Sequence, residues 1–306
     1  MTTIGIVTDS TSRIRGAARE ALSAALDGRF TVVDLSVEVD DETRPDSDWE
    51  AGEVCRAMTD GAIVRTSMPG PLAFTEAIAA VHAAGAHEVL VLTLSSALSG
   101  THGAAVAAAA GSDTVHVIDS GTTSEALAGA VRRAAARAVR GDTGELIAAE
   151  VRRWCAEDSR VFFVPATLTY LERGGRIGRA ASLLGNALSI VPVLGIVEGE
   201  VRPLAKVRTR TKGEQRLVRM AAEAVARMQE AGATSVDVIL LHPEPEAPRE
   251  VLDRVRGLLA AEGIGGEDPG VSGHGAGVAV SESVLSTVVT AHVGPGALGI
   301  AVQTRP

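Results

Sequence analysis

Aromatic residues are scarce in this chain: Phe, Trp and Tyr together make up 2 % of its 306 residues. Alanine, valine, leucine and isoleucine must therefore build the core, since hydrophobic residues still account for 46 % of the sequence. Basic charge is also in deficit, with 29 Lys and Arg against 38 Asp and Glu and a formal net charge of −9. Nucleic acid and anionic membrane surfaces bind basic stripes, so a net charge of −9, without aromatics interleaved with basic residues, argues against both.

Cysteine is nearly absent as well. Cys55 and Cys155 form no Cys-x-x-Cys pattern, and this usage is typical of a protein from a reducing compartment. Residues 1–10 carry no basic segment and run directly into an apolar stretch, which predicts no secretory signal. The longest apolar stretch, 181–197, is interrupted by an asparagine and a proline and falls short of a membrane span. We therefore expect a soluble cytoplasmic protein with no stable membrane insertion.

The length of 306 residues exceeds the usual size of a single hydrophobic core, so two domains are expected, residues 1–158 and 159–306. In the first, short apolar segments alternate with alanine-rich, helix-prone ones, which predicts a doubly wound parallel sheet. The second has a hairpin pattern at 191–207 together with helix-prone crossovers. This mixture predicts a mixed sheet flanked by helices, and the whole chain is expected to belong to the α/β class.

Some local patterns are less regular. Residues 30–39 are expected to form one continuous strand followed by an acidic loop at 40–48, and residues 288–291 are expected to form a strand near the C-terminus. The glycine-rich stretch 263–277 is expected to be a loop. It lacks the strand–GxGxxG–helix context and the lysine of a phosphate-binding loop, so it does not indicate nucleotide binding.

Hydroxyl residues follow two of the predicted strands. One loop reads LSSALSGTHGAA and contains Ser95 and Ser96; the other reads TSMPG and begins with Thr66 and Ser67. The carboxyl ends of parallel strands meet at one edge of a sheet, where open α/β folds bind ligands and helix N-termini favour anions. The SSALSGT loop contains no Lys or Arg, so the expected guest is a singly charged or polar head group rather than a polyphosphate.

His292 is the histidine that best fits such a site. The segment VVTAHVGPGALG places it two residues before Gly294, in a turn of glycine and proline. The other histidines have no metal-ligand spacing with Cys, Asp or Glu, so no metal and no cofactor are expected. Hydroxyl, imidazole and glycine chemistry from three separated segments together indicate one assembled binding site.

Four segments in this order, TSMPG, LSSALSGTHGAA, LTYLERGGRIG and AHVGPGALG, resemble the signature segments of the DegV family of fatty-acid-binding proteins. The resemblance extends from VTDST near the N-terminus to the last predicted strand. It implies a long-chain fatty acid held in a tunnel with its carboxylate at the domain interface, in a chain that performs no catalysis itself. Segments 72–81 and 180–194 are the expected tunnel walls. TSMPG departs from the family pattern at Met68 and Gly70, where Gln and Ser are usual.

The resemblance also implies roles for individual residues. Hydroxyls of the first two motifs are expected to hold the ligand carboxylate, with Ser96 favoured over Ser95. The expected ligand-binding residues are Thr66, Ser67, Ser95, Ser96, Arg176, His292 and Gly294.

A separate partner is implied too, a fatty acid kinase that binds ATP and phosphorylates the presented carboxylate. A basic stretch that holds the only two lysines, Lys206 and Lys212, is a candidate docking surface and equally a solvated hairpin edge. The residues expected to dock the partner are Arg173, Lys206, Arg208 and Arg210.

Two other functions are compatible with the sequence. A serine acyl-hydrolase would use Ser96, His292 and Asp119, although the G-x-S-x-G elbow that normally carries a hydrolase serine is absent. A dihydroxyacetone-kinase-like subunit would need a histidine that traps a carbonyl in a shallow pocket. Asp9 and Asp119 are otherwise expected to cap helices or brace loops where strands end.

Overall fold

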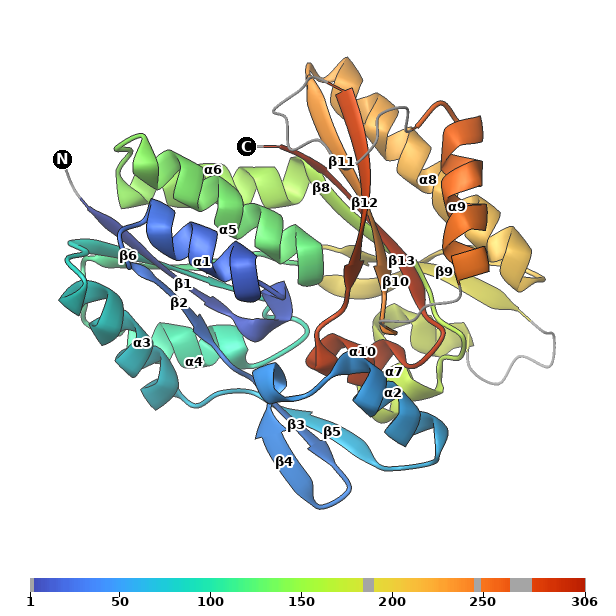
Figure 1. The fold of residues 1–306 in the computed structure, drawn as a ribbon, viewed down its shortest axis with the longest axis horizontal. Coiled ribbons are helices and arrows are strands. Elements are labelled where there is room, and N and C mark those ends of the chain that lie inside the picture. The colour runs from blue at the N-terminus through green and yellow to red at the C-terminus, as the bar shows by residue number, and fades with distance from the viewer. Residues whose placement is uncertain (1–2, 184–189, 245–248, 265–276, 306) are drawn as a thin grey trace.

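Two β-sheets organise the molecule, one in each half of the chain (Figure 1). The structure, a computed structural model, describes residues 3–183, 190–244, 249–264 and 277–305. The last helix of the first half ends at Glu157 and the first strand of the second sheet begins at Ser159, so the chain passes from one sheet to the other at residue 158.

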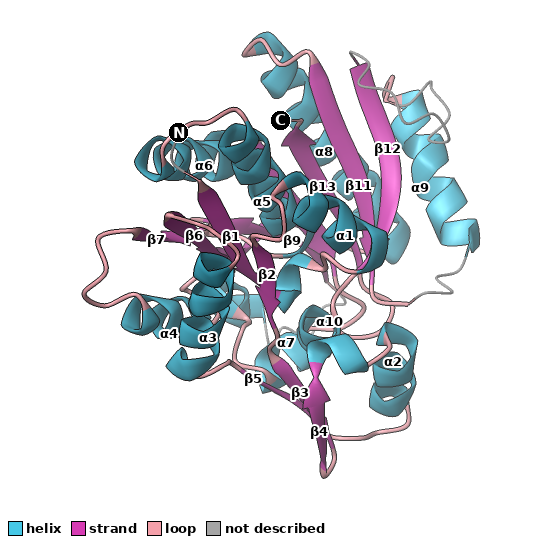
Figure 2. Ribbon diagram, turned by 60° about the vertical axis from the view of Figure 1, so that its left-hand side comes forward, coloured by secondary structure: helices cyan, strands magenta, loops and turns pink. Residues whose placement is uncertain are grey.

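The first half is built on a four-stranded parallel sheet in the order β2-β1-β6-β7. Helices α1, α5 and α6 pack on one face of this sheet, and α3 and α4 pack on the other (Figure 2). This arrangement confirms the predicted doubly wound sheet. The elements are β1 (Ile4–Asp9), α1 (Gly16–Ala25), β2 (Phe30–Val33), α3 (Pro71–Ala83), β6 (Glu88–Thr93), α4 (Thr101–Ala108), β7 (Val115–Asp119), α5 (Ser124–Val139) and α6 (Gly144–Glu157).

The second half contains a six-stranded mixed sheet in the order β10-β9-β8-β13-β11-β12, as the hairpin and crossover pattern predicted. Helices α8 and α9 cover one face, and the other face turns toward α5, whose Ala126 packs against Val161 and Leu241. Strand β12 was not expected from the sequence; residues 265–276 of the predicted glycine-rich loop lie outside the described residues. The elements are β8 (Ser159–Val164), α7 (Thr169–Arg173), β9 (Val191–Val197), β10 (Glu200–Val207), α8 (Arg210–Glu230), β11 (Ser235–His242), α9 (Arg249–Ala261), β12 (Gly277–Val284) and β13 (Leu298–Thr304).

A third, three-stranded antiparallel sheet in the order β4-β3-β5 extends from the first half (Figure 1). It corrects the expectation of one strand over 30–39, since the chain leaves the parallel sheet after β2 and pairs elsewhere. Alternate residues of the new strand then pack on α2 (Ala51–Thr59) and on Trp49, which precedes this helix, and Val37 is buried there. The expected acidic loop likewise contributes a strand. The three strands are β3 (Ser36–Val39), β4 (Glu42–Pro45) and β5 (Val64–Ser67).

The predicted strand at 288–291 is wrong: this segment forms helix α10 (Thr287–Val293). Its residues are mostly β-branched, so local propensity favours a strand, but tertiary contacts override it. The side chain of Ser286 accepts a hydrogen bond from Val289 N, and the buried carboxylate of Asp46 accepts one from Thr287 N at 2.8 Å. Asp46 is paired with Arg15 at 3.1 Å, so the small sheet and α1 together hold the start of α10.

Candidate functional site

A cavity of about 380 Å³ lies where the two halves meet, within the roughly 300–1,000 Å³ typical of small-molecule sites. Leu94 and Thr123 approach it from the carboxyl ends of the parallel strands, the edge at which open α/β sheets bind ligands. The opposite wall comes from the six-stranded sheet and α10 and is mainly apolar. Representative wall residues are Val161, Phe163, Ile196, Leu241, Val289 and Leu298.

The expected tunnel walls do not line this cavity. Leu72 is 68 % exposed, and Phe74 belongs to the core beneath the parallel sheet. Ala180 and Leu183 pack in a separate cluster, and residues 184–189 lie outside the described residues. The sequence could not separate a core helix from a cavity wall, because both bury the same apolar residue types.

The rim of the cavity carries Ser67, Met68 and Gly100, all of which are exposed. Met68 is 54 % exposed and its sulfur packs so closely on Gly100 that a Cβ there would collide with it. Met68 therefore bridges the TSMPG and SSALSGT loops. A thioether stands at the rim where the family pattern has a polar amide.

Thr66 and His292 form the polar centre of the cavity. Strand β5 and helix α10 bring them together from positions 226 residues apart, and the Thr66 Oγ1 to His292 Nε2 distance is 2.9 Å. Burial, and to a lesser degree the positive charge of Arg176, lowers the pKa of His292 from 6.5 to about 4. The imidazole is therefore neutral at neutral pH.

The surroundings of His292 decide where its proton sits. Nδ1 is buried against Gly174, where a Cβ would collide with it, and it has no hydrogen-bond partner among the described residues. A proton on Nδ1 would be a buried donor without an acceptor. A buried acceptor nitrogen without a donor costs less free energy. The proton therefore belongs on Nε2, which donates to Thr66 Oγ1. This leaves the Thr66 hydroxyl proton available to donate to a molecule in the cavity.

Arg176 brings positive charge to this polar centre. Its Nε donates to Leu98 O at 2.9 Å and one terminal nitrogen donates to Gly174 O at 2.6 Å, while the side chain also lines the cavity. The guanidinium thereby ties the SSALSGT loop to the GGR turn of the second half. An anionic head group in the cavity would meet a cation that the SSALSGT loop itself does not contain.

Ser95 and Ser96, both expected at the ligand, are placed elsewhere by the structure. Ser95 is buried and donates to Gly199 O at 2.8 Å, a contact between the two halves. Ser96 is exposed, and its backbone N–H donates to Asp119 Oδ1 at 3.1 Å. Neither residue lines the cavity; Ser99 and Gly100 of the same loop do. The motif identified the correct loop, but the conformation of the loop selects the residues that face inward.

Gly294 is likewise outside the cavity lining. It ends α10 with φ at +77° and its Cα packs on the ring of Tyr170, so a side chain there would be strained and would collide. Its contribution is to end the helix directly after the turn that carries His292. Among the sequence-predicted ligand residues, the structure brings together Thr66, Ser67, Arg176 and His292 at the cavity.

The catalytic arrangement of a serine hydrolase is not assembled. His292 Nε2 contacts Thr66, Asp119 accepts from backbone N–H groups, and within the described ranges no serine hydroxyl is bonded to His292. The described residues also contain no group of three His, Cys, Asp or Glu that could hold a metal ion. No helix in the described part of the chain is both long and apolar enough to cross a membrane.

The four basic residues expected to dock a partner are not equivalent. Arg173 ends α7 and is exposed, and Lys206 and Arg208 are exposed at the end of β10, an edge strand. Arg210 is instead engaged within the protein: it donates to Val164 O at 3.1 Å and Gly296 O at 2.7 Å and contacts the carboxylate of buried Glu214. It is therefore unsuited to dock a partner.

The lowered pKa of His292 predicts a pH effect on stability. Between pH 6.5 and about 4 the unfolded chain takes up a proton that the folded protein does not, so the free energy of unfolding falls as the pH is lowered through this range. Over this pH range we expect the free energy of unfolding of wild type to fall by up to about 3 kcal/mol more than that of His292→Gln. Denaturant unfolding at a series of pH values measures both.

The comparison with His292→Gln also removes the effect of Asp9, which changes the pH dependence of stability in the opposite direction. Burial raises the pKa of Asp9 to about 6, which makes the folded protein more stable as the pH falls, but Asp9 is present in both proteins and cancels. Parallel stability–pH curves for wild type and variant would show that His292 titrates normally.

Known proteins resemble this chain over its full length. The family model described as uncharacterised protein, DegV family, matches residues 3–305. A DegV domain-containing protein of Streptomyces coelicolor is 34 % identical over 305 residues, which cover 99 % of each chain. The solved structure of a fatty-acid-binding DegV family protein from Thermus thermophilus is 29 % identical, with a TM-score of 0.79 over 99 % of this chain and 100 % of the other. A DegV lipid-binding protein from Thermotoga maritima is 26 % identical, with a TM-score of 0.74 over 99 % of each chain.

Proposed function

Because the chain belongs to the DegV family, which includes the fatty-acid-binding protein of Thermus thermophilus, we propose that it binds a long-chain fatty acid in the cavity between its two halves. The observation that carries this proposal is an apolar cavity with Thr66, His292 and Arg176 gathered on its wall. Such a cavity matches a molecule with a long apolar tail and one anionic head. A shallow pocket for a small hydroxyketone would not need this apolar wall.

The energetics favour the tail as the main source of affinity. Each buried methylene contributes about 0.8 kcal/mol, on the order of 10 kcal/mol for a palmitoyl-sized chain. A hydrogen bond from the Thr66 hydroxyl to the carboxylate adds roughly 1.5–3 kcal/mol, and the guanidinium of Arg176 strengthens the same interaction. Ser67, at the rim, is the second hydroxyl that we assign to the head group. The head site therefore orients the ligand, and the tail holds it.

We assign the protein a carrier role without chemistry of its own. Its carboxylate site adjoins the exposed residues Ser67 and Met68, so a bound head group lies close to the surface. This position suits transfer of the head to a separate fatty acid kinase, which would phosphorylate the carboxylate with ATP. Arg173, Lys206 and Arg208 are the exposed cations that we assign to docking of that partner.

The proposal is tested by finding and titrating the ligand. Organic extraction of the purified protein is expected to release a fatty acid that mass spectrometry identifies. Thr66→Ala is expected to weaken fatty-acid affinity by about 1–3 kcal/mol, roughly 5- to 150-fold, because one donor is lost while the tail stays buried.

Ser96→Ala is the matched control and should bind fatty acid as the wild type does, since Ser96 lies outside the cavity. The reverse result, with Ser96→Ala weakened and Thr66→Ala unchanged, would move the head site to the SSALSGT loop. Wild-type protein that neither releases a fatty acid nor binds one in titration would remove the proposal altogether.

A further inference from the structure

A glycine lies within the apolar wall of the cavity. Gly299 belongs to β13, an interior strand of the six-stranded sheet, and its register partners are Phe163 on β8 and Leu241 on β11. All three residues line the cavity. Three neighbouring strands therefore present a large side chain, no side chain and another large side chain in one row.

The side chain that Gly299 lacks would stand on the cavity face of the sheet. Successive residues of a strand point to opposite faces. Ile300 and Val302 pack in the core that α8 covers, whereas Ala301 packs with Leu241 on the other face. Gly299 shares the face of Ala301, so its position leaves a gap that opens into the cavity.

Backbone conformation does not account for this glycine, because its φ lies outside the left-handed region. Inside a strand, glycine weakens the sheet, and it often marks a point where a ligand or another backbone approaches closely. A Cβ at 299 would lie 3.1 Å from Phe162 O, 3.3 Å from Leu241 Cβ and 3.4 Å from Phe163 Cβ. An alanine would fit if these neighbours moved by a few tenths of an ångström, so strand packing alone does not exclude it.

The same distances give the width of the slot above Gly299. The Cβ atoms of Phe163 and Leu241 are less than about 7 Å apart, which is two carbon–carbon contacts of about 3.5 Å. One carbon atom between these walls therefore fills the floor of the slot. A single methylene chain fits along it, whereas a chain widened there by a methyl branch or a ring does not.

We propose that the acyl chain lies across Gly299, between Phe163 and Leu241, and that this glycine makes the tail site selective for an unbranched chain. The inference rests on the proposed function, because it assumes that the carboxylate is held at Thr66. The glycine leaves the floor of the slot open to the chain, and the two large side chains close its flanks. A side chain at 299 would fill the floor and displace the tail.

The first test needs only the wild type. Delipidated protein is titrated with stearate and with a positional series of methyl-branched stearates. A methyl branch at one run of neighbouring positions is expected to weaken binding about tenfold or more, because overpacking a filled site is costly, while branches elsewhere have little effect. Equal binding of stearate and of every branched acid overturns the inference and leaves the carrier role intact.

The second test compares Gly299→Ala with wild type over unbranched acids from octanoate to stearate. Acids too short to reach the slot should bind both proteins equally, and acids that pass through it should bind the variant about tenfold more weakly. Gly195→Ala is the matched control. Gly195 lies on β9 and does not line the cavity, and a Cβ there would meet Leu204 on the face that α8 covers. This control should keep the wild-type dependence of affinity on chain length.

The remaining outcomes separate this inference from the proposed function. A loss in Gly299→Ala that is equal at every chain length, or no loss at any length, overturns the inference. The same length dependence in Gly195→Ala also overturns it, since sheet packing would then set the preference. If Gly299→Ala does not fold, the branched series in wild type decides. Failure of wild type to bind stearate and every shorter acid would instead remove the proposed function.

Discussion

Replacement of Arg210 by glutamate is expected to lower the free energy of unfolding by about 3–5 kcal/mol or more, the cost of breaking a buried ion pair. The guanidinium donates to Val164 O and Gly296 O and contacts the carboxylate of Glu214, which is 1 % exposed. Arg254 holds the other oxygen of that carboxylate at 2.8 Å. A glutamate at 210 would remove three contacts and set a second negative charge beside a buried one.

Denaturant unfolding of two single variants provides the measurement. Arg208→Glu is the matched control, because Arg208 is exposed two residues earlier and carries no ion pair within the described residues; its effect should stay within about 0.5 kcal/mol. If Arg210→Glu were as stable as Arg208→Glu, the buried network around Glu214 would not contribute to the fold. Loss of fatty-acid binding in Arg210→Glu would follow from unfolding and would say nothing about docking.

This contrast shows where sequence reasoning ends. Arg208 and Arg210 are the same residue type two positions apart in one basic stretch, and both were expected at a docking surface. Their difference arises because Arg210 begins α8 and so lies beside the end of β8 and the turn at Gly296. Contacts between segments far apart in the chain are not encoded in local composition.

The fold class was predictable because short apolar segments alternate with helix-prone ones along the first half, and this alternation can be seen in the local sequence. Helix α10 was not, since its β-branched residues favour a strand and its start depends on Asp46, 241 residues away. The candidate site was predictable to the level of its loops. Which serine of SSALSGT faces the cavity depends on the contact between Ser95 and Gly199. Thr123 also lines the cavity but lies outside the four segments that carry the family resemblance.

If the proposed fatty acid kinase docks at β10, reversing the charges of Lys206 and Arg208 together should slow its phosphorylation of the bound fatty acid about tenfold or more. Both side chains are exposed at the end of β10, on a chain with a net charge of −9, so they form a local positive patch that can steer an acidic partner. The fold and the affinity for fatty acid should not change, because neither residue lines the cavity. The effect of the substitutions should shrink as salt is raised, since exposed charges are screened.

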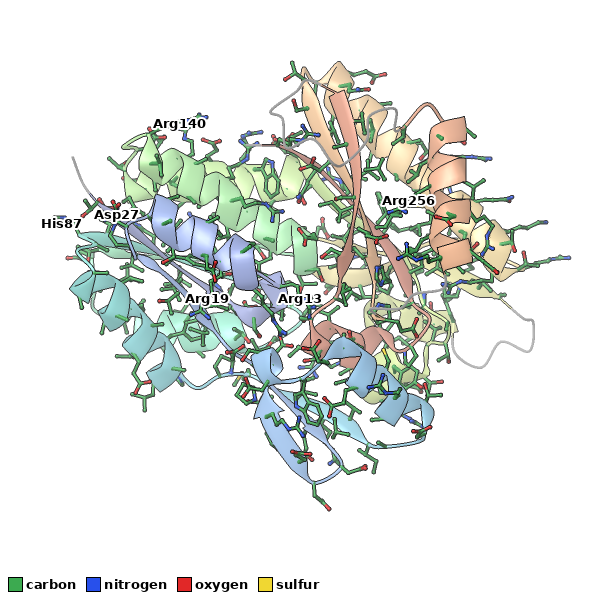
Figure 3. All side chains as sticks on the ribbon, viewed as in Figure 1. Arg13, Arg19, Asp27, His87, Arg140 and Arg256 are labelled. Atoms are coloured by element: carbon green, nitrogen blue, oxygen red, sulfur yellow. The ribbon has the colours of Figure 1, made fainter. Side chains whose placement is uncertain are left out.

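The competing explanation is that these cations only protect an edge strand, because charged side chains on an edge prevent pairing with another chain. The control is the double variant Arg19→Glu, Arg140→Glu, which changes the net charge equally at two exposed positions on α1 and at the end of α5 (Figure 3). Docking at β10 predicts a slow reaction for Lys206→Glu, Arg208→Glu and a wild-type rate for the control. Rates slowed equally in both variants would show that only the total charge of the protein matters. A wild-type rate in the β10 variant, accompanied by aggregation, would establish the protective role of the edge instead.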